Sequence, residues 1–350
     1  MISSFLPYFA GHALCAFSGG FVLCAFSAGD SGQLALLFAA LALGLVPLFG
    51  YAADRFGSSG RLPAVAGLAL CAVALAIGEW SADAAVILAG VGYAAFLAGG
   101  GVDSLNQTRG ATRTAIFLSP APVGFALGTK IAGDGIVPVQ YPIALLIFAS
   151  LTVFFICLGK RQKPERLPAR TKKELFPLVF GSGMLFIASF MRSFVCFSAP
   201  RPESDGKFAW LIPAAAAFAG CLAGGILSEF CGPRVLSAAS ALASAPFFFL
   251  GSGKFIFFAA GLFFISASVA ATVREASLLL PRLEGLAFGI HSVALLAGYL
   301  LSQTVKIPGD AVAGKIACPL LCASAAAVLF FSIRGKKIIT EESKDGTEQA

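Results

Sequence analysis

The chain is a series of long apolar runs separated by short breaks rich in Gly, Pro, Asp, Lys and Arg. Each run is close to the length of about 20 residues that an α-helix needs to cross the hydrocarbon core of a bilayer. Six runs precede a polar break and six follow it. The pattern therefore predicts an all-α membrane protein with twelve transmembrane helices in two six-helix halves. The predicted spans are 5–27, 33–53, 62–80, 84–105, 113–133, 138–159, 176–198, 208–229, 233–251, 255–273, 283–304 and 314–333.

The polar break and the end of the chain set the predicted domain boundaries. Residues 1–159 form the predicted N-terminal half and residues 176–333 the predicted C-terminal half. Residues 160–175 carry seven basic residues and form a predicted cytoplasmic linker, and residues 334–350 form a predicted disordered cytoplasmic tail. The first run lacks a basic segment before it and is longer than a signal-peptide core, so we expect it to be retained as a span.

The composition is typical of a protein whose main solvent is lipid. Hydrophobic residues make up 58% of the chain and charged residues only 12%, whereas about a quarter of the residues in soluble domains are charged. The 39 glycines favour close packing of membrane helices. The nine cysteines lack the spacing of metal ligands. We therefore interpret them as packing residues and expect no metal or other cofactor.

The distribution of positive charge predicts the orientation in the membrane. If the N-terminus is cytoplasmic, the loops and tail on that side hold 18 of the 25 Lys and Arg residues. This bias satisfies the positive-inside rule and predicts a multi-pass protein of the cell (inner) membrane with both termini in the cytoplasm. The net charge of +7 then reflects topology and contact with anionic membrane lipid, and no nucleic-acid partner is expected.

A short motif occurs once in each predicted half, after the second span and after the eighth. The matched positions, each separated by 175 residues, are Gly50 and Gly225, Asp54 and Glu229, and Gly57 and Gly232. The glycines allow close helix contact and turns with positive φ. The acidic residue can cap a neighbouring helix or pair with Arg55 or Arg61. The repetition indicates two parallel repeats.

This duplicated loop resembles the signature loop of the major facilitator superfamily of transporters. The resemblance implies that Asp54 latches the two halves together at the cytoplasmic side in the outward-facing state. It also implies that spans 1, 4, 7 and 10 line a central cavity that binds the solute near the midplane. The sequence departs from the family pattern after the second glycine, where a single Arg61 replaces the usual two basic residues, so the latch can be weaker or paired differently.

Ionisable residues at membrane depth are few, and each is a candidate site because burial there is costly. Arg192 and Ser189 share one face of the seventh span and are predicted to bind a carboxylate or phosphate; the alternative is an arginine that snorkels to the outer headgroups. His12 on the first span and Ser266 on the tenth are further substrate-binding candidates. His12 and His291 can each carry a coupling proton or serve as packing histidines.

Charged residues at the inner ends of the spans form a second set of candidates. Asp103 ends the fourth span, and Arg274 and Glu275 end the tenth span at the equivalent place in the other half. We interpret them as interhelical gate contacts or solvated caps, with direct binding of solute or ion as the alternative. The predicted coupling or gating residues are Asp54, Arg55, Asp103, Glu229, Arg274, Glu275 and His291.

Together these features predict a secondary active transporter, expected to be a monomer, that moves a small organic solute by alternating access with H⁺ as one candidate coupling ion. The chain has no nucleotide-binding loop and no catalytic cluster of the kind that a membrane enzyme needs. Mid-span charges are basic or imidazole, which favours an anionic or zwitterionic solute. An efflux antiporter for hydrophobic or drug-like compounds and a transporter-like sensor are the alternatives.

Overall fold

The computed structural model describes residues 6–26, 31–55, 60–106, 110–135, 138–157, 175–200, 202, 206, 208–251, 254–305, 307 and 312–333. Within these ranges all regular secondary structure is α-helical, as predicted. The helices are α1 (Leu6–Ala25), α2 (Ser31–Gly44), α3 (Val46–Arg55), α4 (Arg61–Ile77), α5 (Ala82–Asn106), α6 (Thr112–Leu118), α7 (Ala121–Asp134), α8 (Gln140–Cys157), α9 (Leu175–Ser198), α10 (Ile212–Cys231), α11 (Pro233–Gly251), α12 (Phe255–Ala267), α13 (Val269–Leu279), α14 (Glu284–Thr304) and α15 (Val312–Ser332). The predicted linker, apart from residue 175, and the predicted tail lie outside the described residues.

Ten helical segments of the described chain are long and apolar enough to cross a membrane. They coincide with ten of the predicted spans. Two shorter apolar helices, Arg61–Ile77 and Gln140–Phe154, lie where the third and sixth spans are predicted. The chain is therefore a multi-pass α-helical membrane protein.

Three of the predicted spans consist of two helices each, with breaks at Leu45, Pro120 and Ser268. Pro47 and Pro120 lack a backbone N–H, so each removes a hydrogen bond near the first two breaks. At the third break the Ser268 hydroxyl donates to the carbonyl of Ile265 at 2.9 Å. Side-chain bonds of this kind often bend helices.

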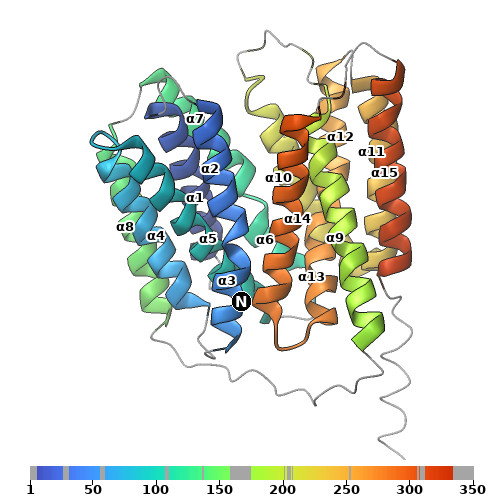
Figure 1. The fold of residues 1–350 in the computed structure, drawn as a ribbon, viewed down its shortest axis with the longest axis horizontal. Helices are drawn as coiled ribbons and strands as arrows, with labels where there is room; N and C mark the ends of the chain where they lie inside the picture. Colours follow the sequence, from blue (N-terminus) through green and yellow to red (C-terminus); the bar gives the residue numbers. More distant parts are fainter. Residues whose placement is uncertain are drawn as a thin grey trace, which may run out of the picture.

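Helices α1–α8 lie on one side of the molecule and α9–α15 on the other, with their axes roughly parallel (Figure 1). The two sides meet where α14 packs against α3 and where α10 packs against α6. These contacts involve the ends of α3 and α10 that carry the duplicated motif, Arg55 and Cys231. We call this end of the bundle, the lower one in Figure 1, the motif end.

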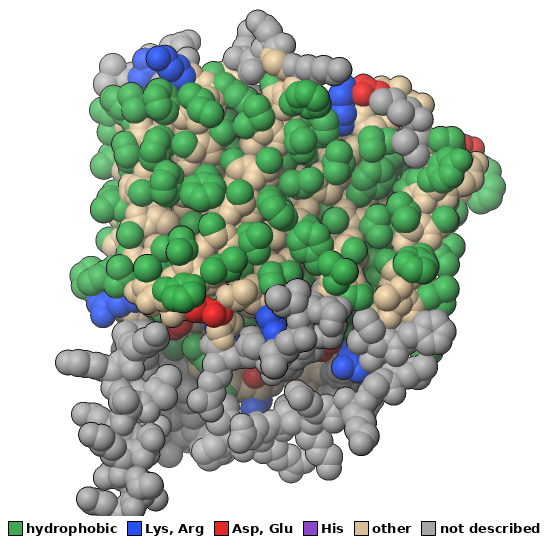
Figure 2. Space-filling model, turned by 180° about the vertical axis from the view of Figure 1, so that it is seen from behind, with side chains coloured by type: hydrophobic (Ala, Val, Ile, Leu, Met, Phe, Trp, Pro, Cys, Tyr) green, Lys and Arg blue, Asp and Glu red, His purple; other side chains and the backbone are tan. Residues whose placement is uncertain are grey.

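The molecular surface carries a broad apolar band. Figure 2 shows hydrophobic side chains over the middle of one face and most Lys, Arg, Asp and Glu side chains near its upper and lower edges. Large side chains such as Phe148, Phe230 and Phe331 are exposed. This distribution suits a surface that faces lipid at mid-height and water at both ends.

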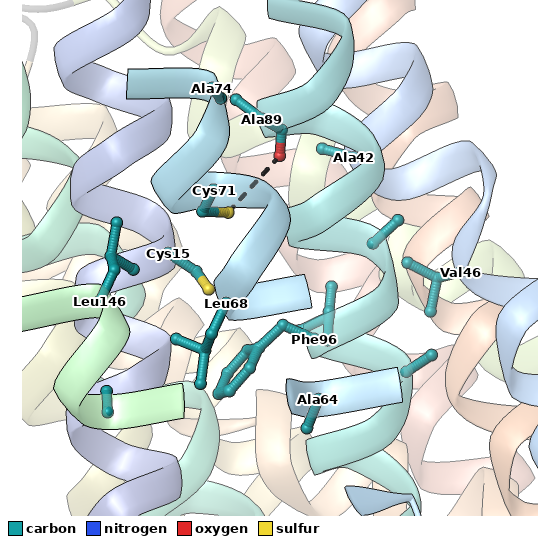
Figure 3. Packing of buried hydrophobic residues seen from close by; sticks show 14 of the residues in the cluster. Cys15, Ala42, Val46, Ala64, Leu68, Cys71, Ala74, Ala89, Phe96 and Leu146 are labelled. Carbon is teal, nitrogen blue, oxygen red and sulfur yellow. Dashed lines mark hydrogen bonds between the residues drawn. The ribbon is translucent and has the colours of Figure 1, made fainter. Parts of the chain in front are cut away.

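The largest buried core lies among α1, α4, α5 and α8 (Figure 3). Cys15, Leu68 and Phe96 are completely buried there. The thiol of Cys71 donates to the carbonyl of Ala89 at 3.9 Å. The described cysteines are free thiols, and the buried ones pack like small apolar side chains, as the sequence predicts.

Candidate functional site

Arg192 on α9 is buried, with 4% of its surface exposed. Its Nη1 group donates to Oγ of Ser268 at 3.1 Å, and its Nη2 group donates to Nε2 of His291 at 3.2 Å. Arg192 therefore connects α9 both to the break between α12 and α13 and to α14. A side chain that is buried and bonded in this way does not snorkel to the headgroups.

The protonation of His291 follows from its two partners. A guanidinium only donates hydrogen bonds, so Nε2 of His291 must accept and the ring proton must lie on Nδ1. Nδ1 lies 2.8 Å from Oγ of Ser189, to which it donates. His291 is thus a neutral imidazole in this arrangement. Ser189, His291, Arg192 and Ser268 form one continuous buried chain, which we call the Arg192 cluster.

Helix geometry explains why α9 supplies two members of this cluster. Residues three apart lie on one helix face, and long side chains lean toward the N-terminal end of their helix. Ser189 and Arg192 therefore both reach toward α14. Ser266 is also buried, but the contact with Arg192 is made by Ser268, which lies about 200° further around the helix.

No carboxylate forms an ion pair with Arg192 within the described part of the chain. The ion pairs found there join Arg61 to Asp103 and Lys130 to Asp134. A buried guanidinium that lacks a carboxylate partner is costly. An anionic ligand bound between the helices would offset that cost.

His12 is buried on the other side of the bundle and does not belong to the Arg192 cluster. Its Nδ1 donates to the backbone carbonyl of Phe117 at 2.6 Å, and the hydroxyl of Tyr93 lies 3.0 Å from its Nε2. The ring also stacks on Phe117 with 4.7 Å between centroids. The partners of His12 are a backbone carbonyl, a tyrosine hydroxyl and an aromatic ring, all of them neutral, which favours the packing interpretation of His12.

The duplicated motif joins the two sides of the bundle. The Asp54 carboxylate accepts hydrogen bonds from the backbone N–H groups of Gly285 at 3.0 Å and Leu286 at 2.9 Å, in the first turn of α14. The Glu229 carboxylate accepts from the N–H of Thr112 at 3.1 Å, at the start of α6. Each acid thus caps a helix of the opposite side, where unpaired N–H groups and the helix dipole favour negative charge.

The motif glycines permit these close approaches. A Cβ atom on Gly50 would clash with the backbone of Gly285, and one on Gly225 would clash with α6. Gly232 follows α10 with a φ of 85°, a conformation that other residues rarely adopt. Gly57, for which the sequence predicts the equivalent turn, lies outside the described residues.

Asp103 is buried on α5 near the motif end. It accepts hydrogen bonds from the Tyr8 hydroxyl at 2.6 Å and from the Gly60 N–H at 3.1 Å. It also forms an ion pair of 3.6 Å with Arg61. Arg61 therefore pairs with Asp103 rather than with Asp54, whose carboxylate is occupied by the first turn of α14.

Arg274 makes another contact between the two sides of the bundle. Its Nη1 group donates to the carbonyl of Leu105 at 2.8 Å, in the last turn of α5, where cations interact favourably with the helix dipole. Glu275 is partly buried beside it, and Arg55 is exposed at the end of α3. The structure thus places the predicted gating residues near the motif end, apart from His291, which belongs to the Arg192 cluster.

A small pocket lies beside His291 on the motif-end side, between α9, α13 and α14. Its lining residues are Ser182, Leu185, Phe186, Ala276, Leu280, Ala287, Ile290 and His291. Oγ of Ser182 is buried and has no hydrogen-bond partner. The pocket is mostly apolar, with one hydroxyl and one imidazole.

Sequence reasoning did not identify Ser268, Tyr8 and Tyr93 as partners of the candidate residues. All three are hydroxyl residues within apolar runs, and that is the only signal the sequence offers for them. Other hydroxyl residues occur in the same runs. The contacts of these three span between 76 and 95 positions in the chain, so only the helix packing reveals them.

The helix arrangement is the fold of major facilitator superfamily transporters. The chain is similar to the crystal structure of a single-residue variant of the E. coli fucose:proton symporter FucP, with a TM-score of 0.64 and 15% identity over 94% of this chain and 97% of that chain. FucP in the outward conformation gives a TM-score of 0.65 and 16% identity over 95% and 99% of the two chains. The human organic anion transporter MFSD10 (TETRAN) gives a TM-score of 0.67 and 14% identity over 94% of this chain and 98% of that chain. The sequence matches no protein-family model and no curated protein.

Proposed function

We propose that this protein is a secondary active transporter that moves a small organic anion or zwitterion across the cell membrane by alternating access. The observation that carries the proposal is the buried Arg192, whose partners in the described chain are the neutral Ser268 and His291. A guanidinium matches the geometry of a carboxylate or phosphate, and its charge-assisted hydrogen bonds are strong. The solved structures that share its fold are transporters, which supports a transport function.

The architecture that accompanies this function is twelve spans in two halves, residues 1–159 and 176–333. The helices α4, with 17 residues, and α8 are short but fall within the range of about 17–25 residues that crosses a bilayer. Counting them with the ten longer segments supports twelve spans. Residues 160–175 and 334–350 are then the basic linker and the tail in the cytoplasm.

In this orientation the motif end faces the cytoplasm and is closed. The caps made by Asp54 and Glu229 and the bond from Arg274 to α5 all hold the two sides together at that end. Breaking these contacts would open the cytoplasmic side, as alternating access requires. The arrangement corresponds to the outward-facing state, in which solute reaches Arg192 from outside the cell.

The test is exchange of labelled solutes by the full chain reconstituted in vesicles. The probes are lactate, benzoate, phosphate, the zwitterion glycine and the neutral sugar fucose. We expect exchange of at least one anionic or zwitterionic probe. Arg192→Gln should reduce that exchange by roughly 30-fold or more, because truncating one partner of a buried charge pair costs about 2–5 kcal/mol.

The matched control is Lys254→Gln, which removes one positive charge at the exposed start of α12. This variant should exchange the same probe at the wild-type rate. Equal activity of Arg192→Gln and wild type would overturn the role of Arg192. Binding of a probe without any exchange would identify the protein as a sensor instead.

A further inference from the structure

In the Arg192 cluster a neutral imidazole faces a guanidinium. Nε2 of His291 accepts from Nη2 of Arg192 at 3.2 Å, while Nδ1 donates to Ser189 at 2.8 Å. Adding a proton to Nε2 would turn this acceptor into a donor. The hydrogen bond to Arg192 would then be lost, and two positive charges would face each other in a buried site. Without a ligand the cluster therefore resists protonation of His291.

A bound carboxylate reverses this situation. It has two oxygen atoms, and each can accept a hydrogen bond. With the carboxylate between the two side chains, one oxygen accepts from the guanidinium and the other accepts from the protonated Nε2. The anion separates the two cations and provides the negative charge that this part of the described chain lacks.

Among the described residues, the charged side chain that contacts His291 is Arg192. The pocket side is apolar: Ala276 lies on α13 and Leu280 directly follows it, and α14 itself contributes Ala287 and Ile290. The other charged groups around α14 lie closer to the motif end. They are Asp54 and Arg55 on α3, Asp103 on α5, Glu284 at the start of α14, and Arg274 and Glu275 on α13.

We propose that His291 is the proton-binding site of this transporter and that it takes up its proton together with a monoanionic solute bound to Arg192. The proposal rests on the proposed function and names its substrate class and coupling ion. The proton comes from water and occupies the lone pair of Nε2, and it returns to water when the anion leaves. One proton accompanies each anion.

The charge of the cluster predicts how transport responds to its driving forces. Without solute the cluster carries the single positive charge of Arg192. With the anion and the proton it carries two positive charges and one negative, which gives the same net charge. The loaded and empty carriers are therefore equivalent with respect to the membrane potential, and the pH gradient alone drives accumulation.

The pocket lies beside His291 on the motif-end side, within the bundle. The unpartnered hydroxyl of Ser182 lines this pocket together with the imidazole, so a water molecule there would have polar partners. In the proposed orientation this side faces the cytoplasm. A proton could leave His291 in that direction once the contacts at the motif end have broken.

The experiment uses the full chain in vesicles and lactate and benzoate as probes. Exchange of a probe between equal pools needs no gradient and tests the proposed function alone. The initial rate of net lactate uptake is then measured with the vesicle interior one pH unit more alkaline than the outside, and the slow uptake of lactic acid by protein-free vesicles is subtracted. We expect accumulation approaching about tenfold for one proton per anion, the same at zero and at −100 mV, with a matching proton influx reported by an internal pH dye.

The deciding variant is His291→Gln. Its amide oxygen can accept from Arg192 and its amide nitrogen can donate to Ser189, but the side chain cannot bind a proton. It should lose pH-driven accumulation, and its remaining uptake should become sensitive to membrane potential. His12→Gln is compared in the same assay. If His12 carried the coupling proton, this variant and not His291→Gln would lose pH-driven accumulation and become sensitive to membrane potential.

The outcomes separate the two proposals. If neither probe is exchanged, the anion-transport function fails for monocarboxylates and the proton site fails with it. If a probe is exchanged but its accumulation does not depend on the pH gradient, or changes with the membrane potential, the assignment of His291 as the proton site is wrong. The proposed transport function then stands. Should His291→Gln not fold, the potential independence and proton influx of the wild-type protein decide the question.

Discussion

A buried arginine without a carboxylate partner is unusual among the residues of a membrane interior. Arg192 has 4% of its surface exposed, and its described hydrogen-bond partners are a serine and a neutral histidine. Such a charge costs folding free energy that a ligand can offset. Residues that break a local rule in this way are typical of functional sites. The sequence singled out Arg192 and Ser189 by their shared helix face, but it could not choose Ser268 over Ser266.

We expect Arg192→Met to stabilise the unliganded protein while it abolishes anion exchange. Replacing a buried ion pair by apolar side chains is often neutral or stabilises by about 1–4 kcal/mol, and removal of a buried guanidinium that lacks a carboxylate partner avoids the same desolvation cost. Thermal unfolding in detergent without added anions measures the effect. Arg274→Met is the comparison and should destabilise, because it removes the bond to Leu105. A clear loss of stability in Arg192→Met would mean that Arg192 is a structural residue.

At the scale of helices, the duplicated motif works by capping. The N-termini of α6 and α14 receive their negative charge from Glu229 and Asp54, each located on the opposite side of the bundle. The sequence predicted that such an acid can cap a neighbouring helix. Which helix it caps depends on how the two sides dock, since the partners are more than 110 positions away in the chain.

We expect Asp54→Ala to shift the protein toward the state in which the motif end is open. Loss of a capping carboxylate costs about 1 kcal/mol, which changes a population ratio by about fivefold. The measurement is maleimide labelling of Ser277→Cys, a buried position in the last turn of α13, in a variant without the native cysteines. Labelling should become about fivefold faster, in proportion to that ratio.

The control for this prediction is Asp134→Ala, which breaks the Lys130 ion pair at the other end of the bundle. It should not change the labelling rate of Ser277→Cys. Glu229→Ala should act like Asp54→Ala because the repeat relates the two caps. An unchanged rate in both cap variants would show that these contacts do not hold the motif end closed.

At the scale of the whole molecule, charge and hydropathy place the protein in its membrane. The apolar band on the surface and the charged edges in Figure 2 agree with the predicted spans. The excess of Lys and Arg in loops on one side predicts a cytoplasmic motif end. Membrane orientation follows from local sequence, because each loop is retained or translocated according to its own charges.

The predicted orientation can be measured with reporter fusions in a bacterial host. Green fluorescent protein fused after residue 350 should fluoresce, because both termini are expected in the cytoplasm. Alkaline phosphatase fused after residue 135, between the fifth and sixth predicted spans, should be active because that loop is expected outside. The reverse pattern of the two reporters would contradict the orientation and place the motif end outside the cell.

The sequence by itself determined the helical class, the positions of the spans and the duplicated motif. These features depend on the length and polarity of segments of about 20 residues. Each segment has these properties without any contact to another span. The tertiary structure decided which residues meet. Asp54 binds the first turn of α14 rather than Arg61, and Arg61 pairs with Asp103. Arg192 is enclosed between Ser268 and His291. Those partners lie on different helices, and packing between helices fixes their rotation and depth.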